Sequence, residues 1–310
     1  MRVFVAVDNL LYSKLAVESL KQRHWPDDTE FMLCHVVEQF DPLFDRSDAS
    51  QSQDHLDKLA DDQQRYIDSM IDWLETMTIE ARQTLPNVES TLGFGNVVAQ
   101  LLLAASSFRA DYIVMGSHHR TEVERAWLGS VAAALTDRVR CCLEIIRPRQ
   151  FTVPDLESLS NLDLTPKNIV IALDASTNSR AALEWAASIA FPRETRVALV
   201  SVIDCPQASI SHLRFHTRVA GLDPAIKNVK QSRSQMTNEV RRYASFLRSR
   251  AKFACIEERI LEGQPAARLV EFAQERDADL IVLGAHREGA SVLGSVARAV
   301  VEQTHCSIAV

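Results

Sequence analysis

The chain has 310 residues, which is enough for two domains of ordinary size. Hydrophobic residues make up 46% and charged residues 24%, the balance of a soluble globular protein, and no apolar run is long enough to span a bilayer. The net charge of −7 is unevenly divided, because residues 1–155 carry 15 Lys and Arg against 24 Asp and Glu, whereas residues 156–310 carry 19 against 17. The acidic first half argues against nonspecific nucleic-acid binding there.

The N-terminal sequence MRVFVAVDNLL moves directly into a strand and a turn, so we expect no signal peptide. Six cysteines lack any CxxC spacing, and several lie in apolar strand-like runs: Cys34, Cys141, Cys142, Cys205, Cys255 and Cys306. This usage is typical of reduced, buried thiols in a cytoplasmic protein. A basic stretch runs from Arg233 to Lys252, and we interpret it as the solvated face of a helix.

The chain repeats itself at a nearly fixed offset. Asp8 lies 166 residues before Asp174, and the glycine pairs Gly95 and Gly263, Gly116 and Gly284, and Gly129 and Gly294 are separated by 168, 168 and 165 residues. We therefore predict a tandem duplication, with a first domain at 1–150, a linker at 151–166 and a second domain at 167–310.

Apolar runs and helical spacing predict alternating strands and helices in the first copy. The expected strands are Val3–Val7, Phe31–Val37, Val88–Leu92, Tyr112–Met115 and Leu143–Arg147. The expected helices are Ser13–Gln22, a long helix that begins within 39–62 and ends at Gln83, Val97–Phe108 and Ser130–Val139. In the long helix, Tyr66, Met70, Trp73 and Met77 form an apolar stripe that favours core packing.

The second copy repeats this plan. Its expected strands are Asn168–Leu173, Val197–Ile203, Leu280–Leu283 and Ser307–Val310. Its expected helices are Ser179–Ile189, capped by Thr177 or Asn178, then Ala225–Arg250 after a loop through Pro206 and Pro224, Ala266–Gln274 and Ser295–Gln303. Strands that alternate with helices predict doubly wound parallel sheets and an α/β fold.

Each copy contains a buried strand that ends in glycine, then a polar loop, and then a helix opened by Gly-Ser, as in DYIVMGSHHRTEVERAWLGSV and DLIVLGAHREGASVLGSV. Ligands of open α/β sheets lie outside the carboxyl ends of the strands, and the free N–H groups of a helix N-terminus suit an anion. Glycine allows a phosphate to approach the backbone closely. The structural alternative is a packing glycine followed by a helix that Ser130 or Ser295 caps.

These segments resemble the universal stress protein family over essentially the whole chain, twice. The resemblance rests on VAVDNLLYSKLA and IALDASTNSRAA, on HVVE and SVID, on the GNV and GQP turns, and on the two glycine loops. The tandem layout is similar to the two-domain E type of the family. The resemblance implies a five-stranded parallel sheet with helices on both faces in each domain, an adenine nucleotide alpha hydrolase-like or Rossmann-like fold.

The ATP-binding members of that family share a loop of the form G-x2-G-x9-G-[ST], to which this chain is similar but incomplete. The first copy matches it at Gly116, Gly129 and Ser130 and has His119 in place of the middle glycine. The second copy matches it at Gly284, Gly294 and Ser295, has Arg287 in that place, and is three residues shorter. An arginine could bind a phosphate through two hydrogen bonds.

By the same resemblance, Asp8 and Asp174 would lie beside adenine and ribose, and Val36 and Val202 would flank the base. The residues beside these motifs complete the implied site: Val7, Met115, Val131, Leu283 and Val296. The bound ligand would be ATP, with Mg²⁺. The alternative for each aspartate is a turn-forming carboxylate that nearby N–H groups satisfy.

The resemblance further implies a cytoplasmic regulatory or protective protein and not a metabolic catalyst. It implies that the two domains pair within the chain about a pseudo-twofold axis, through Leu143–Arg147 and Ser307–Val310, and it leaves homodimerisation open. Two other functions stay open: a pocket for a non-nucleotide small molecule, and an interaction scaffold that binds no ligand. We find no complete Walker A loop, no G-x-S-x-G or HExxH motif, and no third ligand for the pairs His118/His119 or His212/His216.

Overall fold

We analysed a computed structural model of the chain, which describes residues 1–38, 53–117, 129–147, 162–174, 176–204, 222–285 and 293–310. Most of the predicted linker, His118, His119, Arg287, and the pair His212 and His216 lie outside the described residues. Among the helices that it describes, none is both long and apolar enough to cross a membrane.

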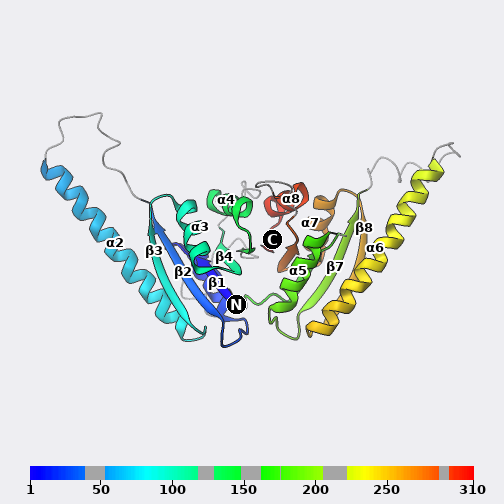
Figure 1. Ribbon diagram of the computed structural model, residues 1–310, viewed down its shortest axis with the longest axis horizontal. Helices are drawn as coiled ribbons and strands as arrows, with labels where there is room; N and C mark the ends of the chain where they lie inside the picture. The colour runs from blue at the N-terminus through cyan, green and yellow to red at the C-terminus, as the bar shows by residue number, and fades with distance from the viewer. Residues whose placement is uncertain (39–52, 118–128, 148–161, 175, 205–221, 286–292) are drawn as a thin grey trace.

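The two halves of the chain have the same order of elements (Figure 1). The first half contains β1 (Arg2–Ala6), α1 (Leu11–Lys21), β2 (Glu30–Val37), α2 (Gln53–Arg82), β3 (Val88–Phe94), α3 (Val97–Phe108), β4 (Tyr112–Gly116), α4 (Ser130–Arg138) and β5 (Cys142–Ile146). The second half contains β6 (Asn168–Ala172), α5 (Thr177–Ser188), β7 (Arg196–Ile203), α6 (Leu222–Arg250), β8 (Cys255–Glu262), α7 (Pro265–Glu275), β9 (Leu280–Leu283), α8 (Ser295–Gln303) and β10 (Ser307–Ala309). The strand β8 is not among those predicted from the sequence.

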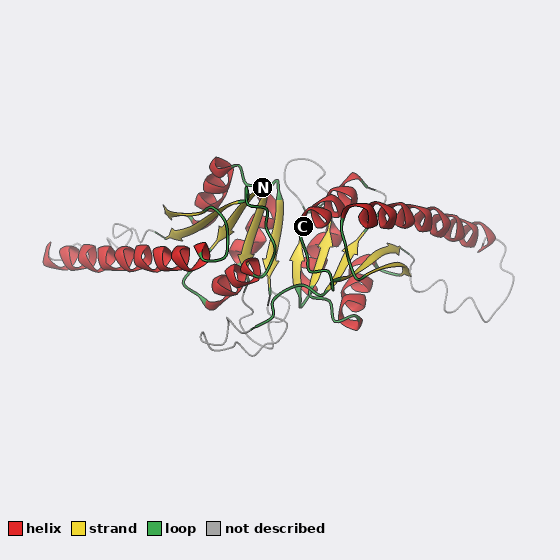
Figure 2. Cartoon of the chain, turned by 90° about the horizontal axis from the view of Figure 1, so that it is seen from below, coloured by secondary structure: helices red, strands yellow, loops and turns green. Residues whose placement is uncertain are grey.

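The strands form one sheet in the order β3-β2-β1-β4-β5-β10-β9-β6-β7-β8. All pairs within each half are parallel, which confirms two doubly wound five-stranded units. The two units do not form separate sheets, because β5 pairs with β10 antiparallel, with Ile308 opposite Ile145. Figure 2 shows the strands continuing across this seam, with α2 and α6 extending away from it in opposite directions.

The inner strands are apolar on both faces because helices cover both sides of the sheet, whereas the edge strands β3 and β8 carry exposed polar residues. In β1, Val3 and Val5 pack with residues of α1 and α2, whereas Phe4 and Ala6 pack with residues of α3 and α4. This alternation, with a period of two residues, divides the interior into two apolar layers.

The predicted helices are present, with three corrections. The sequence placed Pro224 in a loop, but α6 begins at Leu222 and includes it. Proline is tolerated in a first helical turn because its missing N–H would have no partner there. The side chain of Ser176, and not that of Thr177 or Asn178, caps α5 by accepting the N–H of Ser179. Tyr66 is exposed, although Met70 and Met77 of the same predicted stripe are buried.

Buried charged side chains lie beside the strand pair, and one of them, Arg147, joins the two halves. Arg23 donates to both carboxylate oxygens of Glu144, at 2.8 Å each, and to the hydroxyl of Tyr112 at 3.0 Å. Arg147, from the end of the first half, donates to the carbonyls of Thr304 and Val301 at the C-terminus of α8. Cations are favourable at that end of a helix, so Arg147 connects the two halves.

Candidate functional site

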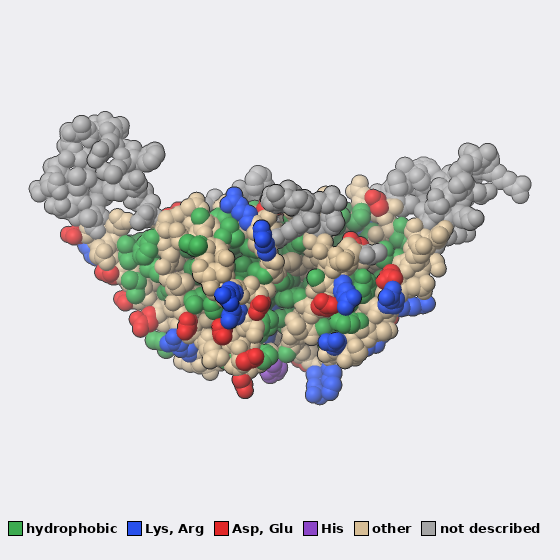
Figure 3. All heavy atoms as spheres, viewed as in Figure 1, with side chains coloured by type: hydrophobic (Ala, Val, Ile, Leu, Met, Phe, Trp, Pro, Cys, Tyr) green, Lys and Arg blue, Asp and Glu red, His purple; other side chains and the backbone are tan. Residues whose placement is uncertain are grey.

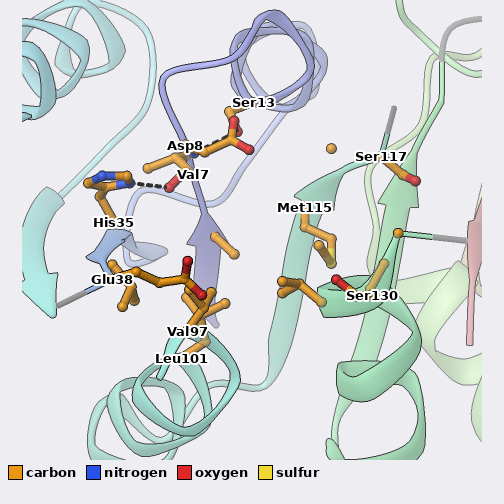
Figure 4. Close-up of a pocket in the computed structure, with 16 residues that line it drawn as sticks. Val7, Asp8, Ser13, His35, Glu38, Val97, Leu101, Met115, Ser117 and Ser130 are labelled. Atoms are coloured by element: carbon orange, nitrogen blue, oxygen red, sulfur yellow. Dashed lines mark hydrogen bonds between the residues drawn. The ribbon is translucent and has the colours of Figure 1, made fainter. Parts of the chain in front are cut away.

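A cavity of about 550 Å³ lies at the carboxyl ends of β1, β2 and β4, where the strand order reverses (Figure 4). Such a position is the usual ligand site of open α/β sheets. Its walls include these residues predicted from the sequence: Val7, Asp8, Val36, Met115, Gly116, Gly129, Ser130 and Val131. The ninth, His119, lies outside the described residues.

Asp8 is held by the turn that it begins. Its Oδ1 accepts the N–H of Leu10 at 3.0 Å and the hydroxyl of Ser13 at 2.6 Å, and its own N–H donates to Ser13 Oγ at 2.8 Å. The turn-forming interpretation is therefore correct for one carboxylate oxygen. Among the described residues, Oδ2 has no hydrogen-bond partner, and it is the oxygen left for a ligand.

Four polar residues of the cavity were missed from the sequence: Ser13, His35, Glu38 and Ser117. His35 lies under the end of β1, where its Nδ1 donates to the carbonyl of Val7 at 2.9 Å and its ring packs against Trp73. Glu38 directly follows β2 and extends over Val97 and Leu101 into the cavity (Figure 4). The HVVE segment contains both His35 and Glu38, but only the strand topology reveals that they lie beside Asp8.

The far wall of the cavity is the start of α4. Gly129 is the N-cap and Ser130 is the first helical residue, so the structural alternative, in which Ser130 caps the helix, is not observed. A Cβ on Gly129 would meet no described atom within 4 Å, and its φ of −56° suits any residue. Packing of the described residues therefore does not explain this glycine, whereas approach of a ligand to the helix N-terminus would.

Gly116 has a different explanation. A Cβ there would overlap the backbone carbonyl of Tyr12 in α1, and a Cβ on Gly284 would overlap that of Asn178 in α5. The packing alternative is thus correct for these two glycines, because a helix approaches the strand end too closely for a side chain.

In the second half, Asp174 repeats the turn of Asp8. Its Oδ1 accepts the N–H of Ser176 at 2.9 Å and the hydroxyl of Ser179 at 2.6 Å. Burial raises the pKa of this carboxyl, but the hydrogen bonds from Ser176 and Ser179 outweigh burial and hold the pKa below its usual value.

The other predicted site residues of the second half do not line one common cavity, unlike those of the first half. Val202 lies on β7, Gly294 is the N-cap of α8, Ser295 is its first residue, and Val296 is exposed. Leu283 and Gly284 line a separate cavity of about 740 Å³ at the seam, together with Trp185 and Val310. The structure therefore brings the predicted residues together in one cavity only for the first half.

The model of the universal stress protein family matches residues 1–147 and again 165–310. The chain belongs to the universal stress protein family.

Individual relatives agree with this assignment. A universal stress protein of Methanocaldococcus jannaschii, MJ0531, is 30% identical over 147 residues, which are 46% of this chain and 81% of that protein. The universal stress protein Mb2028c of Mycobacterium bovis is 26% identical over 232 residues, which are 72% of this chain and 68% of that protein. A solved universal stress protein from Archaeoglobus fulgidus shares the fold, with a TM-score of 0.58 at 14% identity, and the match covers 99% of this chain and 97% of that one.

The five described cysteines of this universal stress protein form no disulfide with one another. Cys34 and Cys306 are buried as predicted, and burial raises the pKa of the Cys34 thiol to about 12. Cys255 is exposed, contrary to the prediction. The described residues contain no group of three or more His, Cys, Asp or Glu that could hold a metal ion.

Proposed function

We propose that this universal stress protein binds an adenine nucleotide, with Mg²⁺, in the cavity of its first half, and acts as a regulatory or protective binding protein. The main support for this proposal is that Gly129, at the N-terminus of α4, is not required by packing among the described residues. The free N–H groups there would bind phosphate, and the hydroxyl of Ser130 would add a hydrogen bond.

The rest of the cavity suits a nucleoside. Val36, Val97, Leu101 and Met115 supply apolar walls, and Asp8 Oδ2 and Glu38 supply acceptors for amino or hydroxyl groups. The volume of about 550 Å³ lies within the range of small-molecule sites.

Binding without catalysis is supported by the hydrogen bonds of the polar residues. The hydroxyl of Ser13 donates to Asp8, and the Nδ1 of His35 donates to a backbone carbonyl. An activated nucleophile needs a base within hydrogen-bond distance. The carboxylate bonded to Ser13 also holds the turn through Leu10, and no described serine of the cavity is hydrogen-bonded to the histidine, so we propose no nucleophilic role for these serines.

The test is calorimetric titration of ATP with and without Mg²⁺ into the full chain and into Ser130→Ala. Loss of one hydrogen bond to a charged phosphate weakens binding about tenfold or more. Ser295→Ala changes the matching residue of α8 and is the control, which should bind ATP as the unaltered chain does. Equal weakening by both variants, or no binding of ATP, would contradict the proposal.

One observation favours a second candidate, a non-nucleotide ligand. Asp8 and Glu38 are the charged side chains among the described residues of the cavity, and no Lys or Arg lines that part. Such walls suit an uncharged ligand with hydrogen-bond donors. Mass spectrometry of small molecules released from the freshly purified, denatured protein separates the two, and release of nothing, without a thermal shift by ATP, would favour an interaction scaffold.

A further inference from the structure

A second concave site lies at the base of the molecule, on the side of the seam opposite the start of α4 and α8. This basal cavity, of about 830 Å³, is bounded by the end of α1, the end of the linker, the turn between α5 and β7, and the C-terminus of α6. Figure 3 shows Lys or Arg side chains (blue) and a His side chain (purple) along this lower edge, with Asp or Glu side chains (red) on the far side of the His.

The basal cavity is positively charged, although the chain carries a net charge of −7. Its lining includes three cations, Arg193, Arg250 and Lys252, together with His24 and a single carboxylate, Glu194. None of the three cations forms an ion pair with another described residue. Three cations elsewhere on α6 do form ion pairs with glutamates: Arg233 with Glu262, Arg242 with Glu239, and Arg248 with Glu258.

The basic stretch on α6 is solvated as the sequence predicted, because its described arginines are exposed. Arg233, Arg242 and Arg248 are paired there, whereas Arg241 and Arg250 form no ion pair with another described residue. The guanidinium of Arg250 lies 5.5 Å from the centre of the Phe246 ring, which orients it without neutralising its charge. Unpaired cations gathered around a cavity favour an anionic ligand.

The floor of the basal cavity is apolar and fixed. Phe191 is buried, and its ring centre lies 6.3 Å from that of Phe253, with Ile189 beside them. Hydrogen bonds hold the segments around the cavity together. Thr195 Oγ1 donates to the carbonyl of Pro166. The Gln22 side chain bonds the backbone of Leu162 and Leu164 at the end of the linker. A ligand with a ring or another apolar part can therefore lie on the aromatic floor, with its charge toward the rim.

We propose that the basal cavity binds a small organic phosphate, with the phosphate between Arg193, Arg250 and Lys252 and the apolar part against Phe253. Arginine binds phosphate oxygens through two parallel hydrogen bonds, and lysine adds a point charge. The cavity has the volume of a small-molecule site and adjoins an acidic first half, which disfavours an extended polyanion such as nucleic acid. This site is separate from the nucleotide site proposed above.

Gln22 and His24 come from the first half, whereas the three cations come from the second. A ligand in the basal cavity would therefore contact both halves beside the bridge between His24 and Ala190. Because a ligand that binds only the folded state stabilises it, occupancy would raise the melting temperature of the whole chain.

The experiment is calorimetric titration of phenyl phosphate and of inorganic phosphate into the full chain and into the double variant Arg193→Gln, Lys252→Gln. We expect phenyl phosphate to bind more tightly than inorganic phosphate, and the double variant to weaken binding of phenyl phosphate about tenfold or more. Arg241→Gln removes one exposed charge of α6 outside the cavity and should leave binding unchanged. Circular dichroism checks that each variant is folded.

Three outcomes would overturn the proposal: no binding of phenyl phosphate, equal weakening by Arg241→Gln, or tighter binding of a single-stranded oligonucleotide than of phenyl phosphate. Ser130→Ala separates this site from the nucleotide site, because that variant should bind phenyl phosphate normally. Weakening of phenyl phosphate binding by Ser130→Ala would place the anion in the first-half cavity and contradict the basal site.

Discussion

Gly116 and Gly129 belong to one sequence motif, yet the structure gives them different physical roles. At Gly116 a side chain would overlap the backbone of Tyr12, whereas at Gly129 it would meet no described atom within 4 Å. Because both residues are glycine, the sequence alone does not distinguish these two roles. Only the approach of α1 to the end of β4 distinguishes the glycine required for packing from the glycine available to a ligand.

This difference predicts opposite effects of alanine. Gly116→Ala should lower stability by about 1–3 kcal/mol or more, as overpacking does. Gly129→Ala should leave stability unchanged or raise it by about 0.4–1 kcal/mol, because its backbone conformation suits alanine. Thermal melting of the two variants measures this. A Gly129→Ala variant that melts as early as Gly116→Ala would contradict the assignment.

The aspartates at the ends of β1 and β6 show how far a residue can be predicted from the sequence. The turn could be predicted, because an aspartate that bonds the backbone two residues on is a common local pattern. The hydroxyl of Ser13 or Ser179, five residues on, could not, because it needs the helix to fold back over the turn.

This hydroxyl predicts a pH-dependent effect of Ser179→Ala. Since the folded-state pKa of Asp174 is lowered, the ionised carboxylate contributes stability above its unfolded value of about 3.9, and this contribution is lost as pH falls through the folded pKa. The loss of melting temperature in Ser179→Ala should therefore be largest near pH 7 and should shrink below about pH 4.

Ser188→Ala is the control for this prediction, because that hydroxyl donates to the carbonyl of Trp185 on the same helix and not to a carboxylate. Its effect on melting should not depend on pH in this range. A Ser179→Ala effect that is equally constant would show that the hydroxyl does not act through the ionised carboxylate.

At the scale of the elements, most strands and helices could be predicted because the inner strands are apolar on both faces and the helices have an apolar side. The edge strand β8, which contains Glu257, Glu258 and Arg259, was missed. The other errors fall at ends. Pro224 and Ser176 lie where a helix begins, and local residue preferences allow several start positions there. Tyr66 was assigned to the core because its spacing fits the stripe of α2, but its side chain is exposed. Figure 1 shows that α2 extends beyond the sheet.

The two long helices depend on the sheet for stability, and α6 gives a direct test. Leu247 is fully buried in the layer between α6 and the sheet, whereas Leu103 of α3 is 61% exposed. Leu247→Ala should lower stability by about 2–5 kcal/mol through lost burial and the cavity left behind. Leu103→Ala should change it by no more than about 0.5 kcal/mol.

Chemical unfolding in urea measures both variants. Equal effects would mean that α6 does not pack on the sheet through Leu247.

At the scale of the whole molecule, the continuous sheet was harder to predict than either half. The resemblance implies that the two apolar last strands meet, but the sequence of one strand gives neither the direction nor the register of such a pair. The antiparallel pair of Ile145 with Ile308 and the bonds of Arg147 to α8 emerge only when both halves are assembled.

The seam predicts the behaviour of the separated halves. A chain ending at Arg147 would leave β5 as an open apolar edge, so we expect it to self-associate through that strand. Sedimentation would then show a dimer or a larger species, and Ile145→Lys should shift it toward monomer. A monomeric, folded fragment with an uncovered β5 would contradict this account of the seam.

Joining the two units in one polypeptide also has an evolutionary consequence. In an assembly of two identical chains, every substitution appears twice, so both binding regions must change together. Here, each unit can acquire substitutions while the other remains unchanged, and the seam still holds them in a fixed relation. The two units differ in this way. The first has the longer glycine loop and a cavity that contains its predicted site residues, whereas the second has the shorter loop and supplies the cations of the basal cavity.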